Sequence, residues 1–433
     1  MSISTSPHLT TSSLPKEASS EHKTLFHQIL IVGGGAAGIT TASQLLEKNK
    51  SLDIAIIEPS DKHYYQPGWT LVGGGVFKLE DTIREQKHCI PKGATWIQDS
   101  VVQLDPERNT VITTTGKSIE YKYLILCPGI QIDWDRIKGL KEALGKDGVT
   151  SNYAKEYAAY TWEVINNFQG GTAIFTMPST PIKCAGAPQK IMYLADDVFQ
   201  RKSGVGTNST VVFCIPGTQL FAVPEYCETL EKVVERRKII VKSKHELKEI
   251  KAQTKEAVFD VTTDNGVEEV SIKYDMIHVT PPMSAPDFVK NSPLAIQTGS
   301  SKGWVDVNKH TLQHNIYPNV FSLGDASSLP TSKTAAAIRK QAPVLVENLL
   351  ALISSGSLQK NYNGYTCCPL ITGYGTTIMA EFDYDKKPVP NFPGKFNAER
   401  YSMWLVKKYV LPWLYWNRML KGRPFEGDLL KGK

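Results

Sequence analysis

The chain has 433 residues, of which 41% are apolar and 21% charged, so it is long enough for two or three globular domains. Its net charge of +6, from 49 basic and 43 acidic residues, gives no support for nucleic-acid binding and fits mild attraction to an anionic membrane. The seven cysteines form no CxxC pair and no metal-ligand spacing, so we expect no metal site and no disulfide-stapled secreted scaffold.

Residues 1–26 are predicted to precede the first domain as a disordered or targeting arm. The first 23 residues are rich in Ser and Thr, have no apolar h-region and contain no Arg. These features exclude a secretory signal and leave a transit peptide and a plain disordered arm as alternatives. No run of about 18 apolar residues occurs, so we expect no membrane-spanning helix.

Strands alternate with helices in two copies along the chain. In the first copy we expect strands at 27–32 and 52–57 around a helix at about 37–48, then strands and loops over 96–126. In the second copy we expect strands at 172–177, 210–215 and 239–242, helices ending near 201 and spanning 224–238, and further strands to 279. A strand at 320–325 and a helix at about 333–353 follow.

This pattern predicts an α/β protein with two Rossmann-like doubly wound domains and a C-terminal amphipathic helical region. The predicted boundaries are 27–136 with 303–360 for the first domain, 137–302 for the second, and 361–433 for the C-terminal region.

A dinucleotide fingerprint lies between the first strand and the first helix, at Gly33-x-Gly35-Ala36-Ala37-Gly38. Gly33 permits a tight turn, Gly35 allows a pyrophosphate to approach the backbone, and Gly38 allows the helix to pack on the strand. The helix N-terminus then presents amides and its positive dipole end to the phosphates. Glu58 ends the next strand, where a carboxylate binds ribose hydroxyls.

The pair Gly324-Asp325 favours FAD over NAD at this fingerprint. A flavoprotein needs a late contact to the ribityl chain, and a strand that ends in Gly-Asp before a helix is the usual form. The helix that starts near Lys333 and Thr334 directs its N-terminus to the flavin pyrimidine edge, where it stabilises negative charge. The alternative role for Asp325 is a helix N-cap.

The second domain lacks a glycine fingerprint. The strand at 172–177 leads into a loop that contains Cys184, and the strand at 210–215 leads into Pro216-Gly-Thr-Gln. Without a pyrophosphate cradle, NAD(P)H is disfavoured as donor or product. Lys183 and Lys190 flank Cys184, and they either lower the pKa of its thiol or are solvated surface charges.

The tail over 401–421 predicts two short amphipathic helices broken at Pro412. Trp, Tyr and Leu lie beside Lys and Arg there, the composition of a helix at a membrane interface. The alternative is a helix that packs on the protein's own core. Tyr374, Phe382 and Tyr384 are weak candidates for the lining of an apolar channel.

Five segments together resemble the mitochondrial-type sulfide:quinone oxidoreductases, which belong to the two-dinucleotide-fold flavoprotein disulfide reductase superfamily. The segments are residues 58–72, 183–193, 278–284, 324–337 and 365–374, and the resemblance extends from about 27 to 422. It implies FAD held by the fingerprint, by Glu58, Gln66 and Val101, and by the Gly-Asp motif.

The resemblance also implies that Cys184 and Cys368 form the redox pair. Sulfide would attack the oxidised pair and leave a persulfide on Cys368, and Cys184 would pass two electrons to the flavin. Ubiquinone would reoxidise the flavin, and glutathione, sulfite or another thiol would remove the sulfur. The implied location is the mitochondrial inner membrane, with peripheral or monotopic attachment.

Cys367 precedes Cys368 directly, where the family pattern has a single cysteine before Pro-Leu. Adjacent residues usually point in different directions, so we expect one of them to face Cys184, and the position before Pro369 favours Cys368. Cys127 lies in a turn where a flavin is expected and is interpreted as a buried structural thiol. The functional alternatives are an NADH:quinone reductase of the same fold and a catalytically silent flavoprotein.

Overall fold

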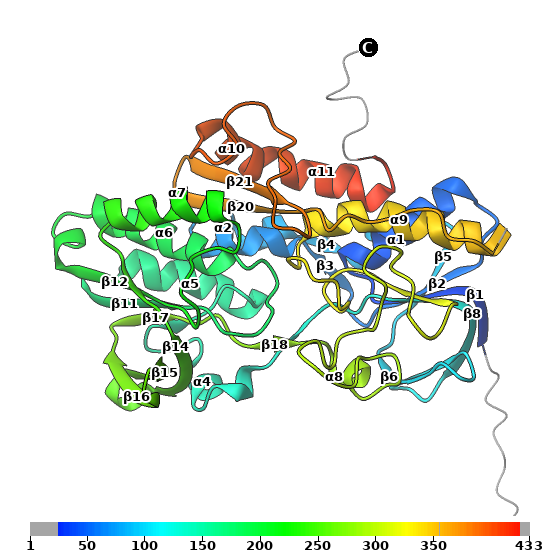
Figure 1. The fold of residues 1–433 in the computed structure, drawn as a ribbon, viewed down its shortest axis with the longest axis horizontal. Coiled ribbons are helices and arrows are strands. Elements are labelled where there is room, and N and C mark those ends of the chain that lie inside the picture. Colours follow the sequence, from blue (N-terminus) through cyan, green and yellow to red (C-terminus); the bar gives the residue numbers. More distant parts are fainter. Residues whose placement is uncertain (1–24, 355, 425–433) are drawn as a thin grey trace, which may run out of the picture.

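The structure is a computed structural model that describes residues 25–354 and 356–424. Most of the predicted N-terminal arm therefore lies outside the described residues. Its last two residues, Leu25 and Phe26, belong to the first strand. Figure 1 shows two lobes side by side, with the C-terminal elements lying across both of them.

The first lobe is a sheet in the order β5-β2-β1-β8-β7-β6, with β19 also paired to β8. Five strands of this sheet pair with one another in parallel: β1 (Leu25–Val32), β2 (Ile54–Ile57), β5 (Ala94–Ile97), β8 (Ser118–Leu126) and β19 (Val320–Ser322). Strands β6 (Val101–Asp105) and β7 (Thr110–Thr113) extend the sheet in antiparallel pairing. Helices α1 (Ala36–Lys48) and α9 (Ala335–Ser354) pack together on one face (Figure 1).

The second lobe is a parallel sheet in the order β10-β17-β11-β12-β13. These strands are β10 (Val149–Thr150), β17 (Met276–His278), β11 (Gly171–Thr176), β12 (Ser209–Cys214) and β13 (Ile240–Lys242), and the helices are α5 (Lys155–Asn167), α6 (Ala187–Arg201) and α7 (Pro224–Arg236). The predicted meander is the antiparallel sheet β14 (His245–Lys251), β15 (Glu256–Thr263) and β16 (Gly266–Lys273). The predicted α/β class with two Rossmann-like sheets is confirmed.

Shorter elements complete the described part of the fold. They are β3 (Lys62–Tyr64), α2 (Trp69–Gly73), β4 (Ile83–Glu85), α3 (Gln86–Cys89), β9 (Gln131–Ile132), α4 (Leu140–Ala143), β18 (Met283–Ser284) and α8 (Asp287–Lys290).

A two-stranded hairpin of β20 (Thr366–Gly373) and β21 (Thr376–Phe382) lies between the lobes. Because side chains alternate along a strand, each face of the hairpin carries every second residue. Cys368, Leu370 and Ala380 join the apolar core of the second lobe, whereas Cys367 and Met379 join the core of the first. The hairpin therefore lies between the two apolar cores and contributes one face to each.

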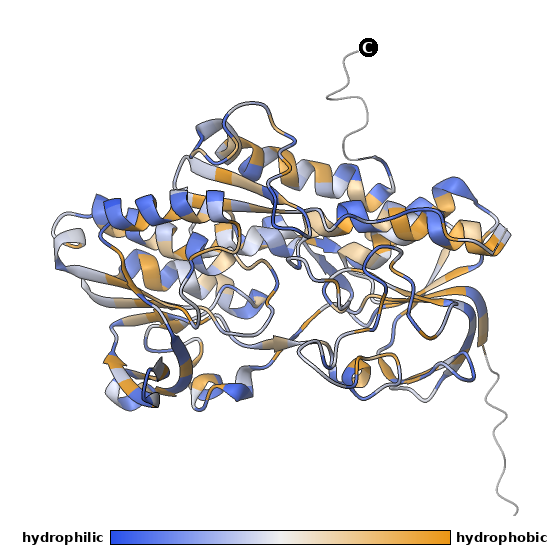
Figure 2. Cartoon of the chain, in the orientation of Figure 1, coloured by the Kyte–Doolittle hydropathy of each residue, from blue (hydrophilic) through white to orange (hydrophobic). Residues whose placement is uncertain are grey.

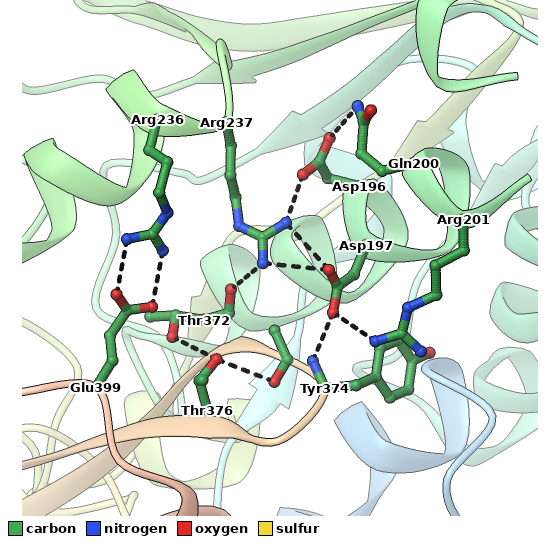
Figure 3. A network of polar contacts seen from close by, with 11 residues as sticks. Asp196, Asp197, Gln200, Arg201, Arg236, Arg237, Thr372, Tyr374, Thr376 and Glu399 are labelled. Atoms are coloured by element: carbon green, nitrogen blue, oxygen red, sulfur yellow. Dashed lines mark hydrogen bonds and ion pairs between the residues drawn. The ribbon is translucent and has the colours of Figure 1, made fainter.

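A polar network fixes the turn of this hairpin to α6 and α7 (Figure 3). Arg237 donates hydrogen bonds to Asp196, to Asp197 and to the Thr372 carbonyl. Asp197 also accepts the backbone N–H of Tyr374 at the hairpin turn. Since Asp196 and Asp197 belong to α6, the network ties the strand that carries Cys368 to the helix that follows Cys184.

The C-terminal segment forms one continuous helical stretch from α10 (Tyr401–Leu405) through a π-helical turn, η6 (Val406–Val410), into α11 (Leu411–Asn417). The predicted break at Pro412 is wrong. The π turn, in which Leu411 N–H bonds to the Val406 carbonyl, widens the helix immediately before the proline. The stretch carries both apolar and hydrophilic residues (Figure 2). None of the helices in the described ranges is long and apolar enough to cross a membrane.

Candidate active site

A cavity of about 620 Å³ extends from the glycine-rich turn after β1 to the C-terminal helices. Its lining includes Cys184 and Cys367, so it also reaches the loop before α6 and the hairpin. The predicted site residues that line it are Gly33, Gly35, Ala36, Ala37, Glu58, Gln66, Cys184, Asp325, Lys333 and Thr334.

The glycine turn forms a cradle that fits the pyrophosphate of FAD. Gly33 has φ +106°, and a Cβ there would lie 2.4 Å from the Cys127 carbonyl oxygen. Gly35 faces open space, with no atom within 4 Å of where a Cβ would lie, and no side chain caps the helix that follows it. The first amides of α1 are therefore free to bind phosphate oxygens.

Glu58 is held beside this cradle by backbone amides. Its carboxylate accepts the N–H of Gly34 at 2.8 Å and of Ser60 at 2.9 Å. Burial raises the pKa of Glu58, and these two hydrogen bonds oppose the shift. Gln86, which the sequence did not indicate, donates to the Gly34 carbonyl at 2.9 Å and contacts His63.

Asp325 lines the cavity in the loop between β19 and α9. Burial raises the pKa of Asp325, while Lys333 and Lys183 oppose the shift. Asp325 is not the cap of α9, because Thr334 Oγ1 accepts the Ala337 N–H at 3.0 Å. The Lys333 ammonium donates to the carbonyls of Asp325 and Ser327, which fixes the Gly-Asp loop against the start of the helix.

Three of the predicted cofactor residues do not line the cavity. Gly38 serves the packing of helix on strand, since a Cβ there would lie 1.9 Å from the Gly33 carbonyl oxygen. Gly324 has φ +73° and faces Ala37 and Ile338. Val101 begins β6 and is buried in the core of the first lobe. The residues around the cradle, Glu58 and Asp325 fit FAD.

The structure brings Cys184 and Cys368 together although 184 residues separate them, with their sulfurs 3.4 Å apart. Cys184 lies three residues before α6 and has φ +54°, an unusual backbone conformation for a residue with a side chain. Its N–H bonds to the Lys333 carbonyl at 2.8 Å. Cys368 is fully buried on β20. Gly186 allows the close approach, because a Cβ there would lie 2.7 Å from the Cys368 sulfur.

Two buried lysines surround this pair. The Lys190 ammonium donates to the Cys184 sulfur at 3.0 Å, and Lys190 is 3% exposed. Lys407, on the π turn, donates to the Pro67 carbonyl at 2.8 Å and is 2% exposed. Burial lowers the pKa of Lys407 to about 7, and the nearby charge of Lys190 adds to this effect. No sequence motif indicated Lys407, which is one of several lysines in the tail.

The electrostatics differ between the two sulfurs. The hydrogen bond with Cys368, and the charges of Lys190 and Lys407, hold the pKa of Cys184 well below its usual value despite burial. The same hydrogen bond, together with burial, raises the pKa of Cys368. Burial alone would lower the pKa of Lys190, but the charges of the two sulfurs outweigh it and raise that pKa. These opposite shifts favour the thiolate form at Cys184 rather than at Cys368.

The two lysines that flank Cys184 in the sequence have different environments. Lys190 is the charge beside the sulfur. Lys183 instead donates to Gln66 Oε1 at 2.7 Å and lies over the Trp69 ring. Burial lowers the pKa of Lys183 to about 8.

Cys367 faces away from the Cys184–Cys368 pair, into the cavity. It lies opposite Glu381 in the hairpin register. Burial raises the pKa of Cys367, and the Glu381 carboxylate raises it further. Cys127 also lines the cavity, with its sulfur 3.7 Å from the Gly33 carbonyl oxygen, and burial raises its pKa.

The aromatic lining differs from the sequence expectation. None of the three expected residues, Tyr374, Phe382 and Tyr384, lines the cavity. The Tyr374 hydroxyl donates a hydrogen bond to the Gly74 carbonyl, and Phe382 is buried in the core of the second lobe. Tyr384 packs on Tyr362. The aromatic residues that line the cavity are Tyr64, Tyr65, Trp69, Tyr153, Tyr365, Phe392 and Tyr415.

Comparison with known proteins shows what this chain is similar to. Residues 27–161 match the family model described as pyridine nucleotide-disulphide oxidoreductase. The mitochondrial sulfide:quinone oxidoreductase of Dictyostelium discoideum is 49% identical over 405 residues, which cover 93% of this chain and 88% of that protein. The mouse mitochondrial sulfide:quinone oxidoreductase is 45% identical over 396 residues, which cover 92% and 87%.

Among solved structures, the sulfide:quinone oxidoreductase of Aquifex aeolicus superposes with a TM-score of 0.78 at 20% identity, covering 92% of each chain. This likeness shows the shared fold. The extent and identity of the match to the two mitochondrial enzymes show more: the chain belongs to the mitochondrial sulfide:quinone oxidoreductase family.

Proposed function

We propose that this chain performs the family's reaction, the FAD-dependent oxidation of sulfide coupled to quinone reduction, with Cys184 and Cys368 as its sulfur-handling pair. The observation that carries this assignment is the 3.4 Å separation of the two sulfurs, with the Lys190 ammonium 3.0 Å from Cys184. The pair adjoins the same cavity as the nucleotide cradle. The same cavity would therefore serve sulfide as the electron donor, FAD as the cofactor and quinone as the electron acceptor.

The chemistry of the pair follows from its electrostatics. In the bridged state, hydrosulfide attacks the Cys368 sulfur, forms a persulfide there and breaks the bond to Cys184. Cys184 leaves as the thiolate, which is the better leaving group because its pKa is the lower of the two. Lys190 and the N-terminus of α6 stabilise that negative charge. Re-forming the bridge after the sulfur has left releases two electrons, which FAD accepts when bound.

An anionic acceptor, such as sulfite or the glutathione thiolate, fits the Cys184 side of the cavity. Lys183 and Lys333 are neighbours in a backbone bridge there and are partly exposed. Both have a pKa lowered by burial to about 8, so both are largely cationic at neutral pH. Their charges attract an anion to the persulfide, which transfers its outer sulfur and leaves the Cys368 thiol.

The quinone fits the opposite end of the cavity, where the lining becomes apolar. The apolar residues there are Met379, Phe392, Val406, Val410, Leu411 and Leu414. The hairpin face with Cys367 and Pro369 borders this end, so we place the quinone ring against β20 and its tail along η6 and α11.

The C-terminal helices supply a surface for membrane contact. Tyr401, Tyr409 and Trp413 are 65%, 58% and 52% exposed, and Leu405 and Val410 are exposed as well. Such residues beside Lys408 are typical of a helix that lies in a membrane interface. The relatives are named mitochondrial, and we place this chain as a peripheral protein at the mitochondrial inner membrane.

The test is anaerobic titration of the purified FAD-loaded protein with sulfide. Wild type should lose its oxidised flavin absorbance and show a long-wavelength charge-transfer band. Cys184→Ala and Cys368→Ser should retain FAD and fail to be reduced, whereas Cys367→Ser should be reduced normally. Reduction by NADH and not by sulfide would instead support the quinone reductase alternative, and no response to either would support the silent flavoprotein.

A further inference from the structure

A buried polar group faces the apolar end of the cavity from the hairpin and α9. Glu381 on β21 is 1% exposed, although its neighbours Ala380 and Phe382 are apolar and buried. Its carboxylate accepts hydrogen bonds from the Tyr365 hydroxyl and from Asn391, through both the side chain and the backbone N–H. Burying an acidic side chain is costly, so its presence at this position calls for a functional reason.

Tyr365 joins this carboxylate to the cavity. Its hydroxyl accepts a hydrogen bond from Arg339 on α9 at 2.8 Å, and both Tyr365 and Glu381 line the cavity. Cys367 follows Tyr365 by two residues and lies on the same hairpin face, beside the position proposed for the quinone ring. The proposed placement therefore puts the quinone ring on the same side of the hairpin as Tyr365.

The pair also has a path to solvent. Asn391, which binds both oxygens of Glu381, lies on the surface loop after β21 and is itself exposed. Asn391 therefore lies between the Glu381 carboxylate and solvent. Two other groups with exchangeable protons belong to this lining: Lys407, whose ammonium donates to the Pro67 carbonyl, and Cys367, whose pKa burial raises.

We infer that Tyr365 and Glu381 form a proton-delivery pair for quinone reduction, with Tyr365 as the donor to the quinone oxygen and Glu381 as the group that restores its proton. Converting a quinone to a quinol takes two electrons and two protons. The proposed oxidation of sulfide supplies the electron pair and one proton. For the second, the Tyr365 O–H bond breaks as the quinone O–H bond forms, the Glu381 carboxylate takes a proton from solvent, and it passes that proton to the Tyr365 oxygen.

This inference rests on the quinone placement proposed above, so the experiment separates the two. Full-length FAD-loaded enzyme is reduced with one equivalent of sulfide and then mixed with decylubiquinone or with ferricyanide, which takes electrons without a proton. Tyr365→Phe and Glu381→Gln should reduce at the wild-type rate and reoxidise normally with ferricyanide. With the quinone their limiting rate should fall by about 10²-fold, at an unchanged half-saturating concentration.

The matched control is Tyr362→Phe. Tyr362 is a buried tyrosine three residues away whose hydroxyl donates to the Tyr365 carbonyl, and it does not line the cavity. This variant should reoxidise at the wild-type rate. An equal loss in Tyr362→Phe, or quinone reoxidation within twofold of wild type in both test variants, would overturn the inference.

The pH profile gives a second readout. The groups that face Tyr365 are Glu381, Cys367, Arg339 and Lys340, the last with its ammonium 5.5 Å from the ring centre. Wild-type reoxidation should be nearly independent of pH near neutrality, whereas that of Tyr365→Phe should rise as pH falls, because solvent must then protonate the quinone. A flat profile in the variant counts against the pair.

The quinone placement has its own check. Cys367→Phe adds bulk to the hairpin face that borders the apolar end, so it should raise the half-saturating quinone concentration without slowing reduction by sulfide. No change would show that the ring lies elsewhere and would refute the placement, while failure of sulfide to reduce the wild type would refute the proposed function itself.

Discussion

Removing the charge of Lys190 tests whether this lysine makes Cys184 a thiolate. The ammonium lies 3.0 Å from the sulfur and is almost fully buried, so water screens the interaction poorly. At an effective dielectric constant of about 20, opposite unit charges at this separation attract by about 5.5 kcal/mol. Desolvation of both groups offsets much of this energy, and a close opposite charge typically shifts a pKa by about 1–3 units, or roughly 1.4–4 kcal/mol.

Lys190→Met should therefore raise the pKa of Cys184 by about 1–3 units. The assay is the rate of alkylation of Cys184 by iodoacetamide in the reduced protein, measured by peptide mass spectrometry between about pH 5 and pH 10. Lys190→Arg retains the charge and should largely retain the low pKa. Lys232→Met removes an exposed lysine of α7 and should change nothing. If the alkylation midpoint of Lys190→Met lies within about half a unit of wild type, Lys190 does not stabilise the thiolate.

Two further predictions concern stability. Arg237→Met leaves the buried Asp196 carboxylate without its ion-pair partner, so urea denaturation should show that the free energy of unfolding falls by about 3–5 kcal/mol. The control is Arg236→Met, whose exposed side chain pairs with Glu399 and whose loss should lower this free energy by no more than about 1 kcal/mol. Equal losses in the two variants would contradict this account of the network in Figure 3. Burial lowers the pKa of His63 to about 4, so the folded state resists its protonation. The stability that neutral His63 contributes is complete above about pH 6.5 and declines as pH falls towards 4, by up to roughly 3 kcal/mol. His63→Gln should remove this part of the pH dependence of the free energy of unfolding. An unchanged slope of that free energy against pH would refute this role of His63.

Local patterns were sufficient for much of the fold. The apolar run of β1, the glycines after it and the helix α1 all agree in period and chemistry, so the cradle could be predicted from the sequence. The same holds for the Cys184 loop, because β11 and α6 flank it in sequence. Helix α5 was not predicted, since only a few of its residues are buried and its apolar stripe is weak.

Contacts between distant segments were harder to predict. The approach of Cys184 and Cys368 depends on how β20 packs against α6, and only the family resemblance suggested it. The directions of Cys367 and Cys368 follow from hairpin register, which residue order alone leaves open by one position. Lys407 belongs to the site because a π turn rotates it inward, a distortion that the expected break at Pro412 concealed.

The position of the β20–β21 hairpin between the two cores has a consequence for how this enzyme diversifies. Even-numbered positions of β20 such as Cys368 and Leu370 adjoin the sulfur-handling side, while odd-numbered positions such as Cys367 and Pro369 adjoin the side assigned to the quinone. Substitutions at alternate positions therefore adapt the enzyme to a new sulfur acceptor or to a new quinone separately. Insertion of a single residue before Cys367 would exchange the two sets of side chains, so this strand tolerates changes of residue far better than changes of length.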